Sequence, residues 1–179
     1  MTEVTTLGIL AKEPIPVIKA NTTYFPAGAV TIAVEDRTLH ADAVERAFRE
    51  ASSASEERIQ EVVRRARAQE TDGQADGGPA LHVLDTATGL EYFRIDAFRE
   101  APHYHYLIPG ERNIRVLYDD FANGDVIDWA VDKIGARLPE LLTAAGAAEL
   151  AAKVDRAAVA AIVPAVAQRA REIAGAARA

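Results

Sequence analysis

Apolar residues follow two different periods along the chain, and these periods divide it into four regions. Residues 1–38 and 80–119 carry short segments rich in β-branched and aromatic residues, separated by turn-forming glycines and prolines. Such segments are typical of β-strands. We expect strands at 3–10, 17–25, 29–36, 80–85, 90–98, 103–108 and 113–119. The pattern therefore predicts a sheet of about five to seven strands.

In residues 40–70 the apolar positions recur every three or four residues, which indicates helical structure. Ser53 and Glu56 fit a capping box at the start of a second helix, although one long helix through the serines fits the pattern as well. The glycine-rich stretch 70–79 has no periodic apolar pattern, and we expect a flexible loop there.

Residues 125–177 are predicted to be helical, with Asp125 and Asp155 as N-caps. Because proline has no amide hydrogen, Pro139 is expected to start a new helix and Pro164 to kink or restart the last one. The alanine-rich helix faces favour close approach of another helix, either within one chain or in a homodimer.

The order of these regions is strands, helices, strands, helices, which favours a single α+β domain. The turns at 86–89 and 109–112 are too short for a crossover, so the strands that they join are expected to be antiparallel. Residues 103–108 are bounded by two prolines, and we therefore expect this strand at an edge or mouth of the sheet. The sequence predicts a mostly antiparallel sheet covered by helices.

The composition excludes several functional classes. The chain has a net charge of −7, which opposes binding to nucleic acid, and it has no cysteine for a disulfide or a thiolate metal site. It shows no signal-peptide pattern and no run of about 20 apolar residues, so we expect a cytoplasmic protein without membrane contact. It has no phosphate-binding loop and no dinucleotide-binding glycine motif, so we expect no nucleotide cofactor.

The candidate chemistry lies in the segment His103-Tyr104-His105-Tyr106. Alternate residues of a strand share a face, so the two histidines are expected to point one way and the two tyrosines the other way. Two imidazoles at this spacing can bind one metal ion, and His82 in another predicted strand offers a third ligand. This donor set suits zinc, iron or manganese. Two alternatives stay open: a metal-free general acid or base with a tyrosine or carboxylate partner, and a purely structural pair.

Other polar side chains of the second strand region extend the candidate site. Arg94 and Asp96 alternate with Tyr92 along one strand, and Asp96 is expected to orient an imidazole. Arg94, Arg115 or Arg112 is a candidate to bind a carboxylate of the substrate. Tyrosine hydroxyls are candidates to orient a small molecule or assist catalysis in an aromatic-lined pocket: Tyr92, Tyr104 and Tyr106.

Two functional hypotheses follow from these residues. In the first, the protein is an enzyme that acts on a small molecule in a histidine-centred pocket, with or without a divalent metal. In the second, it is a non-catalytic domain that binds a ligand through an aromatic-lined pocket or assembles with a partner through a helical face. Stoichiometric metal that disappears when His103 and His105 are replaced would favour the first hypothesis.

Overall fold

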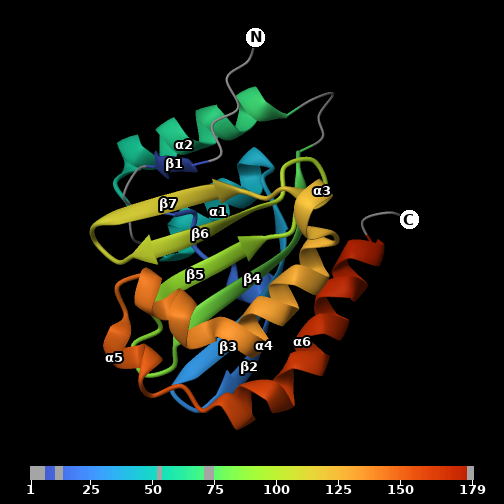
Figure 1. The fold of residues 1–179 in the computed structure, drawn as a ribbon. Coiled ribbons are helices and arrows are strands. Elements are labelled where there is room, and N and C mark those ends of the chain that lie inside the picture. Colours follow the sequence, from blue (N-terminus) through green and yellow to red (C-terminus); the bar gives the residue numbers. More distant parts are fainter. Residues whose placement is uncertain (1–6, 11–13, 52–53, 71–74, 177–179) are drawn as a thin grey trace.

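The structure is a computed structural model that describes residues 7–10, 14–51, 54–70 and 75–176. Within this part of the chain, seven strands form one antiparallel sheet in the order β1-β7-β6-β5-β4-β3-β2 (Figure 1). The predicted α+β class is therefore confirmed. The strands are β1 (Leu7–Leu10), β2 (Thr22–Ala27), β3 (Val30–Thr38), β4 (Gly77–Asp85), β5 (Glu91–Asp96), β6 (His103–Ile108) and β7 (Arg112–Leu117).

Helices cover both faces of this sheet. Figure 1 shows α4 and α6 side by side across one face and α1 behind the opposite face. The helices are α1 (Ala41–Ala51), α2 (Glu56–Gln69), α3 (Asp120–Asn123), α4 (Val126–Ala144), α5 (Ala148–Ala151) and α6 (Arg156–Ala176), together with a short 3-10 helix η1 (Lys19–Asn21). None of the helices in the described residues is both long enough and apolar enough to cross a membrane.

The apolar core lies between the sheet and the pair α4 and α6. Alternate residues of the central strands, such as Ile32, Leu81 and Phe93, point into this layer. Asp125 caps α4 by accepting hydrogen bonds from the amides of Ile127 and Asp128, as predicted. This face of the sheet is mainly apolar, and its burial under α4 and α6 stabilises the fold.

The C-terminal helices begin at the predicted caps, but the structure differs from the prediction at Pro164. Asp155 caps α6 through hydrogen bonds to the amides of Ala157 and Ala158. Residue Arg137 is non-helical and divides α4 just before Pro139, whereas α6 continues through Pro164. The alanine-rich faces pack within the chain, since Ala170 of α6 lies in the core. A homodimer remains a prediction.

The first helical region consists of two helices. Ser55 begins α2, and its hydroxyl accepts a hydrogen bond from the amide of Arg58 at 3.3 Å. The predicted cap, Ser53, lies outside the described residues. The predicted strand at 17–25 instead begins with η1, and β2 follows as an edge strand that accommodates Pro26.

The predicted loop at 70–79 extends too far, because β4 already begins at Gly77. Part of this loop, 71–74, lies outside the described residues. Gly78 pairs with Arg37 of β3, and a Cβ atom at this position would lie 2.6 Å from the carbonyl oxygen of Ala97. The glycines therefore mark a close approach of two backbones.

The prediction that residues 103–108 form an edge strand is wrong. β6 lies between β5 and β7, and both of its edges are hydrogen-bonded. Pro102 and Pro109 flank the strand without entering it, so neither removes an amide from the ladder. The two histidines of β6 are consequently placed in the interior of the sheet.

Candidate functional site

The sheet face opposite α4 and α6 carries buried charged and polar side chains. Removing such groups from water is unfavourable unless they are paired, so a group of them indicates a specific role. The buried polar residues of this face include Glu35, Arg37, His82, Arg94, Asp96, His103, His105 and Asn113.

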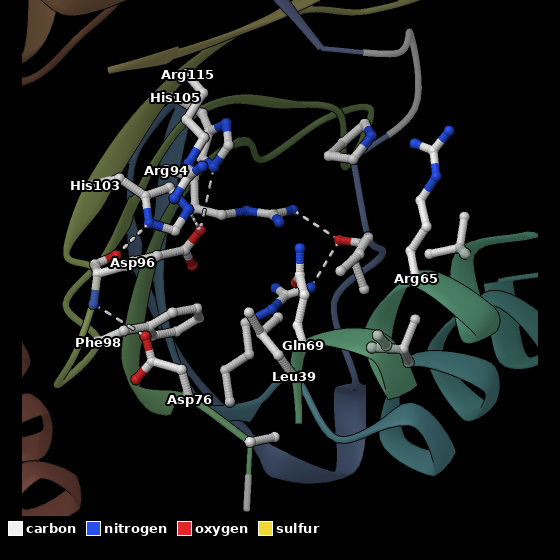
Figure 2. Close-up of a pocket in the computed structure, with 18 of the residues that line it drawn as sticks. Leu39, Arg65, Gln69, Asp76, Arg94, Asp96, Phe98, His103, His105 and Arg115 are labelled. Atoms are coloured by element: carbon white, nitrogen blue, oxygen red, sulfur yellow. Dashed lines mark hydrogen bonds and ion pairs between the residues drawn. The ribbon is translucent and has the colours of Figure 1, made fainter. Parts of the chain in front are cut away.

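Strand register brings three of these side chains together. His103 lies directly opposite Asp96 of β5, and His105 shares the face of His103 because it is two residues further along β6. The Nε2 atoms of both histidines lie 3.3 Å from the same atom, Oδ2 of Asp96 (Figure 2). All three side chains are buried. The structure therefore brings together the histidine pair and the aspartate that the sequence singled out.

The other ring nitrogen of each histidine already has a partner. Nδ1 of His103 lies 2.7 Å from the carbonyl oxygen of Ala101, and Nδ1 of His105 lies 2.6 Å from Oδ1 of Asn113. Because a carbonyl oxygen can only accept, Nδ1 carries the hydrogen. In the neutral imidazole Nε2 then has a lone pair, and this lone pair points at a carboxylate oxygen. For a neutral imidazole such a contact is repulsive, and it becomes favourable when a proton or a metal cation lies between the two atoms.

Asp96 offers a second unsatisfied atom. Its Oδ1 is buried and has no hydrogen-bond partner among the described residues. Burial alone would raise the pKa of Asp96, but its contacts with His103 and His105, with Arg94 and Arg37 nearby, hold this pKa well below its usual value. Burial lowers the pKa of His105 against the opposing effect of Asp96. A charged carboxylate thus faces an imidazole that is poorly disposed to ionise.

The three donor atoms have the spacing of ligands to one metal ion. They all lie within 4.8 Å of one another. Ligands about 2.0–2.2 Å from an ion lie about 2.8–3.5 Å apart when their angles at the ion are between square and tetrahedral. Both Nε2–Oδ2 distances, at 3.3 Å, fall in that range. The group of Asp96, His103 and His105 could therefore hold a metal ion, and we call it the His/Asp group.

His82 does not join the His/Asp group. Its Nδ1 lies 2.6 Å from Oε1 of Glu91, and its Nε2 lies 3.1 Å from Oε2 of Glu35. Burial alone would lower the pKa of His82, but the two carboxylates outweigh burial and raise it. The predicted third metal ligand is instead the centre of a buried ion-pair network.

A β-bulge explains why Glu91 reaches this network. Val83 pairs with Phe93 but the next residue of β4, Leu84, pairs with Glu91, so Tyr92 is the extra residue on β5. A bulge interrupts the alternation of side chains. Glu91 therefore shares the polar face with His82, whereas Tyr92 packs against the apolar core. The prediction that Tyr92 lies beside Arg94 in a pocket is corrected.

Arg94 is committed to structural contacts. Its guanidinium pairs with both carboxylate oxygens of Glu91 and donates to the carbonyl oxygen of Ile15 at 3.0 Å. Arg37 donates to the carbonyl oxygens of Ile15 and Pro16 and to Glu35. The segment before β2 is thus fixed across the sheet by two buried arginines, and Arg94 is not available as the predicted substrate anchor.

The tyrosines of β6 lie on the opposite face from the histidines, as the alternation predicts. Tyr104 packs against Trp129 with ring centroids 5.1 Å apart, and Tyr106 packs against Phe93 at 5.2 Å. Burial raises the pKa of both tyrosine hydroxyls. Neither tyrosine lines the cavity beside the His/Asp group, which separates them from any chemistry there.

A cavity of about 920 Å³ lies between the polar face of the sheet and the helices α1 and α2 (Figure 2). The His/Asp group and Arg115 line the sheet side, whereas side chains of α1 and α2 line the other. Among the described residues its phenyl and phenol lining is limited to Phe48 and Phe98, and arginines and aliphatic residues make up much of the rest of the predicted aromatic-lined pocket. This volume is in the range of small-molecule sites.

Three contributors to this site were not identified from the sequence. Glu35 and Arg37 are charged residues at alternate positions of a β-branched strand, and that pattern was the available signal. Asn113 orients His105, yet an isolated asparagine at the start of a strand carries no signal by itself. The role of each of these three residues depends on which strand lies beside its own strand.

The fold and the site define an α+β protein with one sheet and a buried His/Asp group facing a cavity. The family model described as a domain of unknown function (DUF7700) matches residues 24–170, and the chain belongs to this family. The matched range includes the whole His/Asp group. No curated protein and no solved structure gives a significant match.

Proposed function

We propose that the protein is an enzyme that acts on a small molecule through a divalent metal ion held by Asp96, His103 and His105. One observation carries this proposal: two imidazoles whose Nδ1 atoms are already engaged direct Nε2 at the same buried carboxylate oxygen. A shared cation would make all three contacts favourable. Two imidazoles and a carboxylate suit zinc, iron or manganese.

Three protein ligands would leave coordination positions for a substrate or a water molecule. A bound ion would supply Lewis acidity and lower the pKa of a coordinated water. The chain's own residues would orient the ligands, because the carbonyl oxygen of Ala101 and the side chain of Asn113 fix both imidazole rings. The helices α1 and α2 would limit the access of water to the cavity.

A second candidate function is non-catalytic binding of a small molecule. The observation in its favour is the aliphatic wall that α1 and α2 contribute to the cavity, which includes Val44, Val62 and Ala66. Such a binding domain has no need for a metal. The metal content of the protein therefore distinguishes the two candidates.

Untagged wild-type protein, exposed to zinc, iron(II) and manganese and then dialysed, is expected to retain about one ion per chain. A His103→Ala/His105→Ala variant should retain less than about a tenth of that amount, since it loses two of three ligands. The matched control is His40→Ala, because His40 is half-exposed and lies outside the cavity. Elemental analysis by mass spectrometry gives the measurement. A metal-free wild type, or equal metal content in the double variant, would refute the proposal.

A further inference from the structure

The cavity is lined by an excess of cationic side chains, although the whole chain is acidic. Six arginines line it against three carboxylates, Asp76, Asp96 and Glu100. The net charge of the chain is −7, so this local excess does not follow from composition. Positive charge in a cleft concentrates anions. A divalent ion on the His/Asp group would increase the positive charge further.

Several of these arginines are already engaged by other parts of the protein. Arg37 and Arg94 are buried in the ion-pair network beneath the segment before β2. Arg58 and Arg65 on α2 both pair with Glu61. These four side chains shape the cavity, and each of them already has a carboxylate partner.

Arg115 differs from these four arginines. Its Nε is buried and has no hydrogen-bond partner among the described residues, and no ion pair involves its guanidinium there. Burial lowers the pKa of Arg115, and only the field of Asp96 opposes this. A buried guanidinium donor without an acceptor is unfavourable, and a carboxylate of a ligand would satisfy it with two parallel hydrogen bonds.

Arg115 also lies beside the His/Asp group. It is the direct cross-strand neighbour of His105 on β7, so the two side chains leave the same face of the sheet about 5 Å apart. Figure 2 shows Arg115, His105, His103 and Asp96 gathered on one side of the cavity, with Gln69 and Arg65 of α2 on the other. A carboxylate at Arg115 would therefore adjoin the candidate metal centre.

The wall opposite also carries a set of apolar side chains beside Arg65 and Gln69. Val44 and Phe48 of α1 and Val62 and Ala66 of α2 line the cavity there. A small, doubly charged anion would leave this wall uncovered in a space of about 920 Å³. A hydrocarbon chain or ring attached to the carboxylate would cover it and gain the free energy of apolar burial.

We propose that the cavity binds an amphipathic monocarboxylic acid, with its carboxylate on Arg115 and its hydrocarbon part along α1 and α2. This inference rests on the proposed function only in that the acid would be the substrate presented to the metal. Binding itself depends on Arg115 and the apolar wall.

Isothermal titration calorimetry with octanoate, octanol and succinate tests the inference on zinc-loaded and zinc-free protein. Octanoate is expected to bind about 10- to 100-fold more tightly than octanol, because it alone offers a charged acceptor to Arg115. It should also bind more tightly than succinate, which leaves the apolar wall uncovered. Arg115→Gln should weaken octanoate binding by a similar factor, and Arg115→Lys should weaken it less.

The matched control is Arg64→Gln, because Arg64 is exposed on α2 and does not line the cavity. Thermal melts identify any variant that fails to fold. Failure of octanoate to bind the wild type, equal binding by Arg115→Gln, or tighter binding of succinate would overturn the inference. Metal content is measured on the same samples. Arg115-dependent octanoate binding by a protein that retains no metal even after exposure to zinc, iron(II) and manganese would refute the proposed function and leave this inference intact.

Discussion

Saturating zinc is expected to raise the midpoint of thermal unfolding of the wild-type protein by about 5–10 °C and to leave an Asp96→Asn variant nearly unchanged. An ion that binds only the folded state at about 100 times its dissociation constant stabilises it by about 2.7 kcal/mol. For a chain of this size, each kcal/mol shifts the midpoint by about 2–4 °C.

Asparagine keeps the shape of Asp96 but removes the charge that the two imidazoles face at 3.3 Å. Differential scanning calorimetry with zinc and with a chelator measures the shift. His40→Ala serves as the control and should respond to zinc like the wild type, because His40 is outside the cavity. An equal zinc-dependent shift in Asp96→Asn would mean that the ion binds elsewhere.

Replacing His82 by alanine is expected to lower the free energy of unfolding by about 3–5 kcal/mol, because the change leaves two buried carboxylates without their shared partner. The imidazole of His82 is fully buried between Glu35 and Glu91, at 3.1 and 2.6 Å. Arg37 and Arg94 still face these carboxylates and limit the loss.

The loss of unfolding free energy in His82→Ala should depend on pH. The pKa of His82 is raised in the folded protein, so its stabilising effect is complete below about pH 6.5 and disappears as the pH rises through that raised pKa. The pKa of Glu91 is lowered, so its effect is complete above about pH 4.3 and disappears as the pH falls through the lowered pKa. The difference between wild type and His82→Ala is therefore expected to be largest between about pH 4.3 and 6.5.

Urea unfolding of metal-free protein at several pH values measures this difference. The double variant His82→Ala/Glu91→Gln should recover no stability, because it also leaves the buried guanidinium of Arg94 without its carboxylate partner. A loss below about 1 kcal/mol for His82→Ala, or a loss that does not vary with pH, would show that the network is not ionised as described.

Local patterns predicted the parts of this protein that depend on local geometry. The alternation of His103 and His105 follows from the two-residue period of a strand, and both side chains do share a face. The caps at Asp125 and Asp155 were predicted for the same reason, since a cap involves only the next few residues.

The order of the strands in the sheet determines which side chains meet, and local sequence patterns could not predict that order. β5 lies between β4 and β6, so His82 is two strands away from the histidine pair, or about 9.6 Å across the sheet. This separation excludes His82 from the His/Asp group. The bulge that exchanges the faces of Glu91 and Tyr92 depends on the register with β4 and is equally invisible in the sequence of β5.

Diffraction from crystals grown with zinc, collected at the zinc absorption edge, tests the account most directly. We predict one strong anomalous peak about 2.0–2.2 Å from Nε2 of His103, Nε2 of His105 and a carboxylate oxygen of Asp96. An empty map at that position, or a peak only at surface carboxylates, would contradict it.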